Sequence, residues 1–208
     1  MFRGGVVRRR VAGPLIALAL VVGWLSGEPA LAEGGIRTFL MGDSFAVGMA
    51  PMFGADQTIA MIGGSVHHRW ESVPNIDRGT RVVLVLGTND SVETGPEGVA
   101  NYGYRVREIA RKLSDRAREV IWVGPPCILP GHIHIDDEYL SEMTQVQREA
   151  VLELGRPNVR WVSMRAMTQR DGVCLEDDRT EDQVHFTAAG YARIVREIRK
   201  AAGMPARR

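Results

Sequence analysis

The 208-residue sequence predicts a three-layer α/β domain with a parallel central sheet, and two observations lead to this fold class. Short runs rich in Val, Ile and Leu recur along the chain from Ile36 onward. Longer stretches with an apolar residue at every third or fourth position lie between and after these runs. An alternation of strands and helices specifies a sheet covered by helices on both faces, with right-handed crossovers. We see no internal repeat and no second domain.

Five apolar runs mark the expected strands. They are short and rich in branched side chains, which is typical of strands buried on both faces of a parallel sheet. The expected strands are Ile36–Met41, Thr58–Ile62, Val82–Leu86, Val120–Val123 and Val159–Val162.

Four stretches have the periodicity of helices. The first follows the first strand at Phe45–Met52, and the clearest one places Arg and Lys opposite an apolar face between Val99 and Leu113. A third helix is expected at Asp136–Leu154 and a last one around Tyr191–Ile198. Because ligands of such domains bind beyond the carboxyl ends of the strands, chemistry is expected in the segments after each strand. The stretch Ser163–Val184 has no evident helix or strand, which favours a functional loop.

The composition limits the classes of molecule that this protein is expected to bind. The formal charge is +1, with 26 basic and 25 acidic residues, and this near-neutral balance excludes a dedicated nucleic-acid binder. A small molecule or a neutral polymer is the favoured partner. No G-x-G-x-x-G or P-loop follows the first strand, so a dinucleotide or phosphate site is not expected.

Residues 1–32 have the parts of a secretory signal peptide. Arg3, Arg8, Arg9 and Arg10 precede an uncharged run, and Ala30-Leu31-Ala32 presents small residues where a signal peptidase reads them. The run is shorter than the roughly 20 apolar residues of a membrane span, which argues against a retained anchor. We expect cleavage after Ala32 and a secreted or periplasmic protein. The chain from Glu33 onward then carries 22 basic and 24 acidic residues, a net charge of −2.

The two cysteines gain meaning from this expectation. An oxidising compartment allows Cys127 and Cys174 to form a disulfide, although two free buried thiols remain the alternative because the sequence gives no distance.

Three residues suit nucleophilic catalysis. Ser44 follows the first strand at a helix start, and Asp182 and His185 lie just before the last helix. A serine nucleophile needs a base to take its proton, and the imidazole needs a carboxylate to fix its tautomer. The structural alternatives are an N-cap serine, an ordinary histidine at a helix start and one more charge in an acidic run.

Two further residues suit an oxyanion hole. The side-chain amide of Asn89 ends the third strand as a neutral donor, and Gly64 lets its backbone N–H approach a reacting oxygen. With the N–H of Ser44 they would provide three donors. Gly63 is the alternative to Gly64.

Taken together, these blocks resemble those of the SGNH (GDSL-type) hydrolases. The order and spacing agree over nearly all of the chain after the leader, and the entry into the last helix is also similar. The blocks are Gly42-Asp43-Ser44, the glycine after the second strand, Gly87-Thr88-Asn89-Asp90, and Asp182-x-x-His185. Phe45 stands where the familiar name of the family expects Leu. The second block has fewer residues that match the family's pattern than the other blocks have.

The resemblance implies a flavodoxin-like sheet of about five parallel strands and a serine esterase that needs no metal or organic cofactor. Ser44 would be the nucleophile, His185 the base and then the acid, and Asp182 the orienting carboxylate of an acyl-enzyme mechanism. An exported esterase for short acyl groups of a carbohydrate is the leading hypothesis. The rivals are an O-acyltransferase acting on an envelope or extracellular glycan, a lysophospholipase- or thioesterase-type lipid esterase, and a non-catalytic envelope binding protein.

Three other features have competing interpretations. His132, His134 and Asp136 alternate as in a metal site, but no further ligand cluster accompanies them. His67, His68 and Trp70 follow the second block, where Trp70 could stack on a sugar or simply pack in the core. Asp90 is expected to be a structural acceptor or a helix cap.

Overall fold

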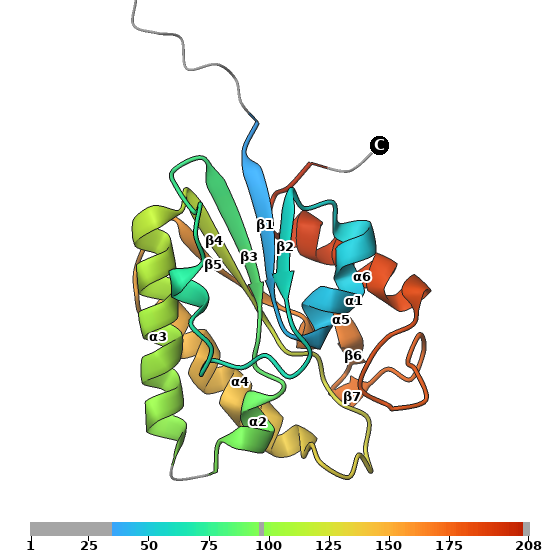
Figure 1. The fold of residues 1–208 in the computed structure, drawn as a ribbon. Helices are drawn as coiled ribbons and strands as arrows, with labels where there is room; N and C mark the ends of the chain where they lie inside the picture. The colour runs from blue at the N-terminus through green and yellow to red at the C-terminus, as the bar shows by residue number, and fades with distance from the viewer. Residues whose placement is uncertain (1–34, 96–97, 206–208) are drawn as a thin grey trace, which may run out of the picture. The chain divides into compact units, whose positions relative to one another are not determined.

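A computed structural model describes residues 35–95 and 98–205, and the expected signal peptide and its cleavage site lie outside these residues. Five parallel strands form one sheet in the order β2-β1-β3-β4-β5. Figure 1 shows this sheet between two helical layers, as the sequence predicts. The strands are β1 (Arg37–Gly42), β2 (Gln57–Ala60), β3 (Thr80–Val85), β4 (Glu119–Gly124) and β5 (Val159–Ser163).

The alternation of side chains along each strand builds two cores. Leu40 and Val83 point to one face of the sheet, whereas Met41 and Leu84 point to the other. Burial on both faces holds for β1, β3 and β4 but is wrong for β2 and β5. These two strands form the edges of the sheet: no residue of β2 is fully buried, and only Val162 is buried in β5.

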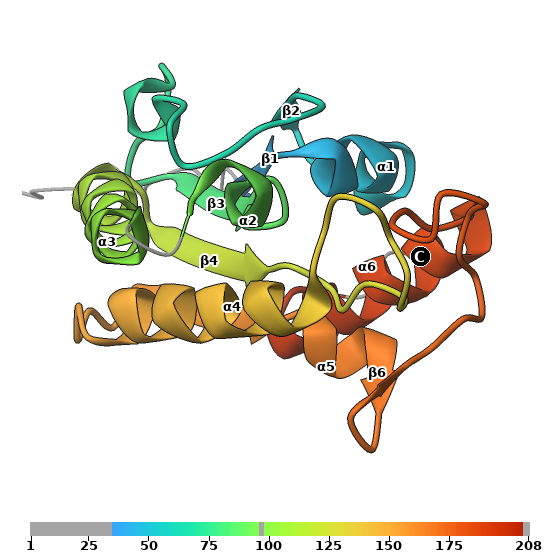
Figure 2. The same cartoon turned by 90° about the horizontal axis from the view of Figure 1, so that it is seen from below.

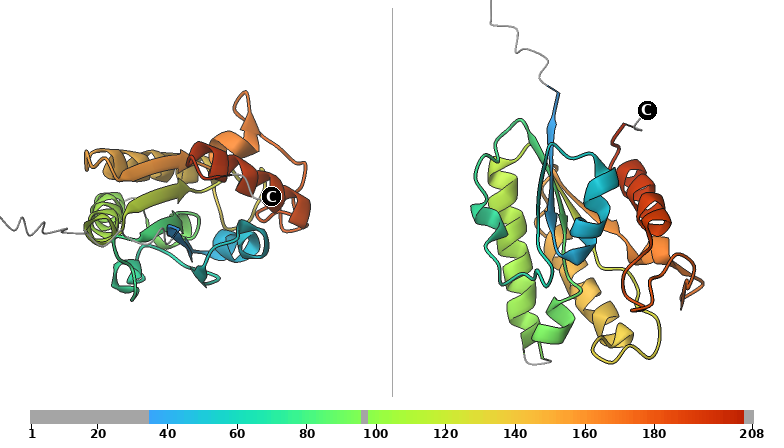
Figure 3. Two further views of the ribbon diagram at one scale, coloured as in Figure 1. Left: turned by 90° about the horizontal axis from the view of Figure 1, so that it is seen from above. Right: turned by 45° about the vertical axis from the view of Figure 1, so that its right-hand side comes forward.

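Two helices cover each face. The helices α1 (Ser44–Phe53) and α6 (Ala188–Ala201) pack together on one face, and α3 (Val99–Arg116) and α4 (Asp137–Leu152) pack on the other (Figures 1, 2 and 3). The apolar face expected for α3 is buried as predicted. None of the helices in the described residues is long and apolar enough to cross a membrane.

The segment 163–184 is more ordered than the sequence suggests. It contains a short helix, α5 (Arg165–Thr168), and a two-stranded hairpin of β6 (Gln169–Arg170) and β7 (Val173–Cys174). A 3₁₀ turn, η1 (Trp70–Ser72), and a short helix, α2 (Asp90–Glu93), are further elements that the sequence did not predict. Elements of two to four residues are too short to establish a period, so the pattern could not reveal them.

A disulfide between Cys127 and Cys174 decides the question that the sequence left open. The two Cα atoms are 5.8 Å apart, within the range that a disulfide spans. The bond joins the segment that follows β4 to the hairpin strand β7. It therefore fixes the hairpin to the carboxyl edge of the sheet.

Replacing both cysteines with serine is expected to lower the free energy of unfolding by up to about 4 kcal/mol, because a closed loop of this length restricts the unfolded chain. Urea denaturation followed by circular dichroism measures the change. Reductant should shift the midpoint of the wild-type protein and leave that of the double variant in place. A wild-type midpoint that is insensitive to reductant under unfolding conditions would contradict the prediction.

Candidate active site

Ser44 is presented at the carboxyl edge by a tight turn between β1 and α1. Gly42 has a φ of +140°, and a Cβ atom there would lie 2.0 Å from the carbonyl oxygen of Val85, so only glycine fits. Asp43 then caps α1, since its Oδ1 accepts the N–H of Phe45 at 2.9 Å. Ser44 is thus the first helical residue, and the N-cap interpretation of this serine is wrong because Asp43 has that role.

The structure brings the three candidate residues into one hydrogen-bonded chain. His185 Nε2 lies 2.8 Å from Ser44 Oγ, and His185 Nδ1 lies 2.6 Å from Asp182 Oδ2. Because an ionised carboxylate only accepts, it assigns the proton of the neutral ring to Nδ1. The lone pair of Nε2 is then free to accept the hydroxyl proton of Ser44. This is the arrangement that activates a serine.

A short turn joins Asp182 to His185. Asp182 Oδ1 accepts the N–H of Val184 at 3.0 Å, the N–H of His185 at 2.9 Å and the hydroxyl of Thr180 at 2.7 Å. Burial alone would raise the pKa of Asp182, but the hydrogen bonds from the His185 ring and N–H, with those from Thr180 and Val184, hold it well below its usual range. Gln183 completes the turn in the left-handed region with a φ of 63°. The carboxylate is therefore fixed in place and charged.

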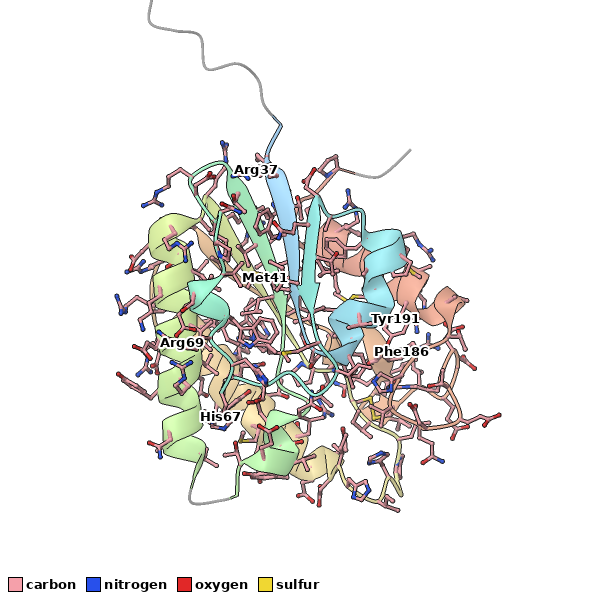
Figure 4. All side chains as sticks on the ribbon, in the orientation of Figure 1. Arg37, Met41, His67, Arg69, Phe186 and Tyr191 are labelled. Carbon is pink, nitrogen blue, oxygen red and sulfur yellow. A yellow bond between two sulfur atoms is a disulfide. The ribbon has the colours of Figure 1, made fainter. Side chains whose placement is uncertain are left out.

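A cluster of aromatic side chains lies on one side of the imidazole. The ring of Phe45 lies 5.2 Å from that of His185 and 6.1 Å from that of Phe186. Phe186 in turn meets Tyr191 edge to face at 5.7 Å, and Figure 4 shows this pair beside α1. Phe45, the departure from the family's usual Leu, thus packs directly against His185.

Arg179 is a site residue that the sequence analysis missed. It donates to the carbonyl of Val184 at 2.7 Å and to that of Cys127 at 2.5 Å, and its guanidinium lies 4.0 Å above the ring of Phe186. Burial lowers its pKa to about 10, so it stays positively charged at neutral pH. Arg179 therefore holds both neighbours of His185 against the segment after β4. No sequence pattern marks this role, because all the contacts arise from tertiary folding.

The predicted oxyanion donors lie around the ends of β1, β2 and β3. The N–H of Ser44 has no hydrogen-bond acceptor among the described residues. Asn89 Nδ2 donates to the carbonyl of Gly64 at 2.9 Å, which leaves its second amide hydrogen for a ligand. The N–H of Gly64 already bonds to the carbonyl of Met61 at 3.2 Å, whereas that of Gly63 has no acceptor in the part of the chain that the structure describes.

Two buried carboxyl groups lie behind this edge. Asp90 Oδ1 accepts the N–H of Val66 at 2.9 Å, which supports its predicted role as a structural acceptor and anchors the segment after Gly64. Asp43 and Asp90 are almost fully buried, and each has a second oxygen without a hydrogen-bond partner among the described residues. Burial raises the pKa of Asp43 to about 8, and the nearby charge of Asp90 contributes to this increase. Burial likewise raises the pKa of Asp90 to about 7, with a contribution from the charge of Glu93.

These raised pKa values predict a stability that falls as the pH rises. The folded protein keeps protons that the unfolded chain releases above pH 3.8, so their contribution is complete below about pH 4 and is lost by about pH 8. Asp43→Asn and Asp90→Asn keep the accepting oxygen. Each should reduce the difference in the free energy of unfolding between pH 5 and pH 8 by about 1 kcal/mol or more. Urea unfolding at pH 5 and pH 8 measures this. The exposed Asp171→Asn serves as a control, and equal slopes in all four proteins would refute the prediction.

The remaining sequence candidates have structural partners. Trp70 is only 4% exposed and donates its indole N–H to the carbonyl of Ser65 at 2.8 Å, so its interpretation as a sugar-stacking platform is wrong. His68 Nδ1 lies 3.2 Å from the N–H of Ser65, and His67 is exposed (Figure 4). Asp136 caps α4, and no group of three potential metal ligands occurs among residues 35–95 and 98–205.

A serine is hydrogen-bonded to an imidazole, and the imidazole to a carboxylate, at the carboxyl edge of a parallel α/β sheet. This arrangement defines the class of α/β enzymes that work through an activated serine. The model of the GDSL-like lipase/acylhydrolase family matches residues 41–193. The chain belongs to this family and is an ester hydrolase of the SGNH type. No curated protein matches the chain.

Solved structures share the fold at low sequence identity. A lipase/acylhydrolase from Enterococcus faecalis is 22% identical with a TM-score of 0.59, and the match covers 79% of this chain and 96% of that one. An acetyl xylan esterase from Geobacillus stearothermophilus is 15% identical with a TM-score of 0.60 over 84% and 97% of the two chains. A peptidoglycan O-acetylesterase is 19% identical with a TM-score of 0.56 over 71% of this chain and 46% of that one, so this chain matches about half of its length.

Proposed function

We propose that this ester hydrolase is exported and removes short acyl groups, above all acetyl groups, from a carbohydrate. The observation that carries the proposal is the hydrogen-bonded chain of Ser44, His185 and Asp182 at an exposed edge of the domain. The side chains of His185 and Asp182 remain 35% and 49% exposed. Export is supported by the N-terminal sequence and by the pairing of the two cysteines.

The reaction begins with the proton of Ser44. His185 Nε2 takes this proton as Oγ attacks the ester carbonyl, and Asp182 stabilises the resulting imidazolium through Nδ1–H. The tetrahedral intermediate then expels the alcohol, which receives the proton from Nε2. Water attacks the acyl-serine in the same way, with His185 again as the base. The products are a carboxylic acid and the free Ser44.

The developing oxyanion is stabilised by neutral donors. The N–H of Ser44 lies at the N-terminus of α1, where the helix dipole favours negative charge. The free amide hydrogen of Asn89 and a glycine N–H of the 63–64 turn complete the set. Gly64 is the predicted donor, but its N–H bonds to the carbonyl of Met61, so the N–H of Gly63, which has no acceptor among the described residues, suits the role better. Loss of one such donor costs about 3 kcal/mol of transition-state stabilisation.

The exposed position of the site supports a large alcohol component. A polymer can reach a serine at the open edge of a sheet without threading through a channel. The names of the structural neighbours, an acetyl xylan esterase and a peptidoglycan O-acetylesterase, are consistent with acetylated glycans as substrates of this fold. The proposal therefore combines a small acyl group with a carbohydrate alcohol.

Hydrolysis of 4-nitrophenyl esters of increasing acyl length tests the acyl preference. We expect kcat/KM to be highest for acetate and to fall with longer chains. Release of acetate from acetylated xylooligosaccharides then tests the alcohol component. A preference for acyl chains of eight or more carbons would contradict the acetyl proposal and favour a lipid substrate.

Arg179→Met is expected to lower kcat by about tenfold to hundredfold with little change in KM, because His185 would lose the contacts that hold both its neighbours. Arg179→Lys should recover part of kcat, since it keeps the charge above Phe186 but cannot form both hydrogen bonds. Steady-state kinetics on 4-nitrophenyl acetate measure the effect. Arg193→Met is the control, because Arg193 bonds Asp178 and the Met167 carbonyl. Equal losses in the two methionine variants would mean that Arg179 has no special role.

A further inference from the structure

A hollow of about 820 Å³ lies beside the disulfide, between residues 128–138 and residues 172–176. Ser44, Asp182 and His185 are not among its lining residues. Figure 1 shows the loop after β4 and the strand β7 next to each other beyond the lower edge of the sheet. The volume of the hollow is within the range of sites that bind small ligands. We call this hollow, with its lining residues 128–138, 172–174 and 176, the hairpin groove.

The walls of the hairpin groove are held rigidly. Asp137 accepts the N–H of Ile128 at 2.7 Å and pairs with both terminal nitrogens of Arg165 at 2.6 and 2.9 Å. Cys174, in the opposite wall, is bonded covalently to Cys127. A groove that is organised before binding avoids the entropy cost of ordering a loop around the ligand.

Two large aliphatic side chains that line the groove are exposed to solvent. Ile133 is 84% exposed on the loop and Val173 is 69% exposed on β7, and both line the groove. Exposed apolar side chains that line one concave surface are typical of ligand contact sites.

The polar lining suits a neutral polyhydroxylated ligand. His132 Nδ1 accepts the N–H groups of His134 and Ile135 at 3.2 and 3.0 Å, which places the proton of the neutral ring on Nε2 as a donor. Glu138 and Glu176 add acceptors, and no Lys or Arg is among the described residues that line the groove. Carboxylates without a basic partner repel an anionic polymer, whereas sugar hydroxyls can both donate and accept.

A series of direct contacts connects the hairpin groove to the proposed catalytic residues. Cys174 is bonded to Cys127, the carbonyl of Cys127 accepts from Arg179, and Arg179 also holds Val184 beside His185. The geometry points to the hairpin groove as a subsite for sugar units that flank the acylated unit in a neutral glycan chain. This inference rests on the proposed carbohydrate esterase function and specifies the class of its substrate.

Binding to a non-hydrolysing protein tests the subsite directly. The full chain with Ser44→Ala is titrated with uncharged xylohexaose, cellohexaose and chitohexaose, and with anionic hexagalacturonate, while the methyl signals of isoleucine and valine are followed by NMR. We expect a neutral hexasaccharide to shift the signals of Ile133 and Val173, and the anionic one to leave them in place. Absence of neutral binding, or equal binding of the anionic chain, would overturn the inference.

Substitutions separate the groove from unspecific effects. Ile133→Ser with Val173→Ser should weaken binding of the neutral chain about tenfold, which corresponds to about 1.4 kcal/mol. His132→Asn, which keeps an acceptor near the position of Nδ1 but removes the Nε2 donor, should weaken it less. Leu152→Ser, at the other end of α4, is the matched control. Equal weakening by the control would contradict the assignment.

Kinetics distinguish failure of the subsite from failure of the proposed function. With wild-type catalytic residues, the double groove variant should lower the ratio of kcat/KM for acetylated xylohexaose to that for 4-nitrophenyl acetate about tenfold. An unchanged ratio with normal hydrolysis of the aryl ester would overturn the subsite and leave the esterase in place. If the wild-type protein hydrolyses neither ester but still binds neutral chains, the proposed esterase function is overturned and the binding role of the groove remains.

Discussion

Replacing Ser44 with alanine is expected to lower kcat for 4-nitrophenyl acetate about 10⁵-fold, because no other hydroxyl is bonded to His185 Nε2 in the described structure. His185→Ala should cause a loss of similar size. The double variant should be no worse than either single one, since nucleophile and base act as a unit. Steady-state kinetics with purified variants measure these losses.

The control for this prediction is Ser141→Ala, an exposed serine on α4 that is remote in sequence from the candidate site. It should retain wild-type kinetics. Circular dichroism and unfolding midpoints of the Ser44 variant should match those of the wild type, because a half-buried hydroxyl is removed without creating a large cavity. Residual activity above about one hundredth of the wild type would contradict the role of Ser44.

Asp182→Asn is the second large expected effect, a fall in kcat of about 10³- to 10⁴-fold. The asparagine amide can face His185 Nδ1 with its NH₂ group, which places the ring proton on Nε2 and removes the acceptor for the hydroxyl of Ser44. The carboxylate also loses its stabilisation of the imidazolium. Because hydrogen bonds hold the pKa of Asp182 well below its usual range, the wild-type carboxylate stays ionised in weak acid, so loss of activity there is not due to its protonation.

Thr180→Val provides the matched control for Asp182. It removes one hydrogen bond to Oδ1 but leaves the contact of Oδ2 with the imidazole. A loss of less than about tenfold is expected, because the N–H groups of Val184 and His185 still hold Oδ1 in place. Equal losses in Thr180→Val and Asp182→Asn would show that the turn geometry, rather than the carboxylate charge, is what matters.

The sequence predicts the parts of this fold that repeat a period. The five strands, the four long helices and the buried face of α3 follow from hydrophobic patterns that recur over several turns or strands. The pattern failed at β2 and β5, where apolar runs suggested burial on both faces although both strands are edges. It also failed at α2, α5 and the hairpin, which are too short for a period to develop.

The candidate site divides in the same way. Ser44, Asp182 and His185 could be found because each lies at a strand end or helix start in a recognisable block, and their meeting is a consequence of parallel topology. The capping role of Asp43 is local, since its carboxylate accepts the N–H of Phe45 two residues further on, and the turn at Gly42 decides that Asp43 rather than Ser44 is the cap. The contacts of Arg179 and the burial of Trp70 depend on packing between segments distant in sequence. Residue type alone gave no signal for them. An indole suits both a sugar platform and a core, so the sequence left both interpretations of Trp70 open, and its burial decides for the core.

Covalent labelling tests the central claim most directly. The wild-type protein is incubated with a fluorophosphonate probe, and the intact mass and the modified peptide are determined by mass spectrometry. We predict one probe per chain, attached to Ser44, with no labelling of Ser44→Ala and greatly slowed labelling of His185→Ala. An unlabelled wild-type protein, or a label that persists in Ser44→Ala, would contradict the assignment of Ser44 as the activated nucleophile.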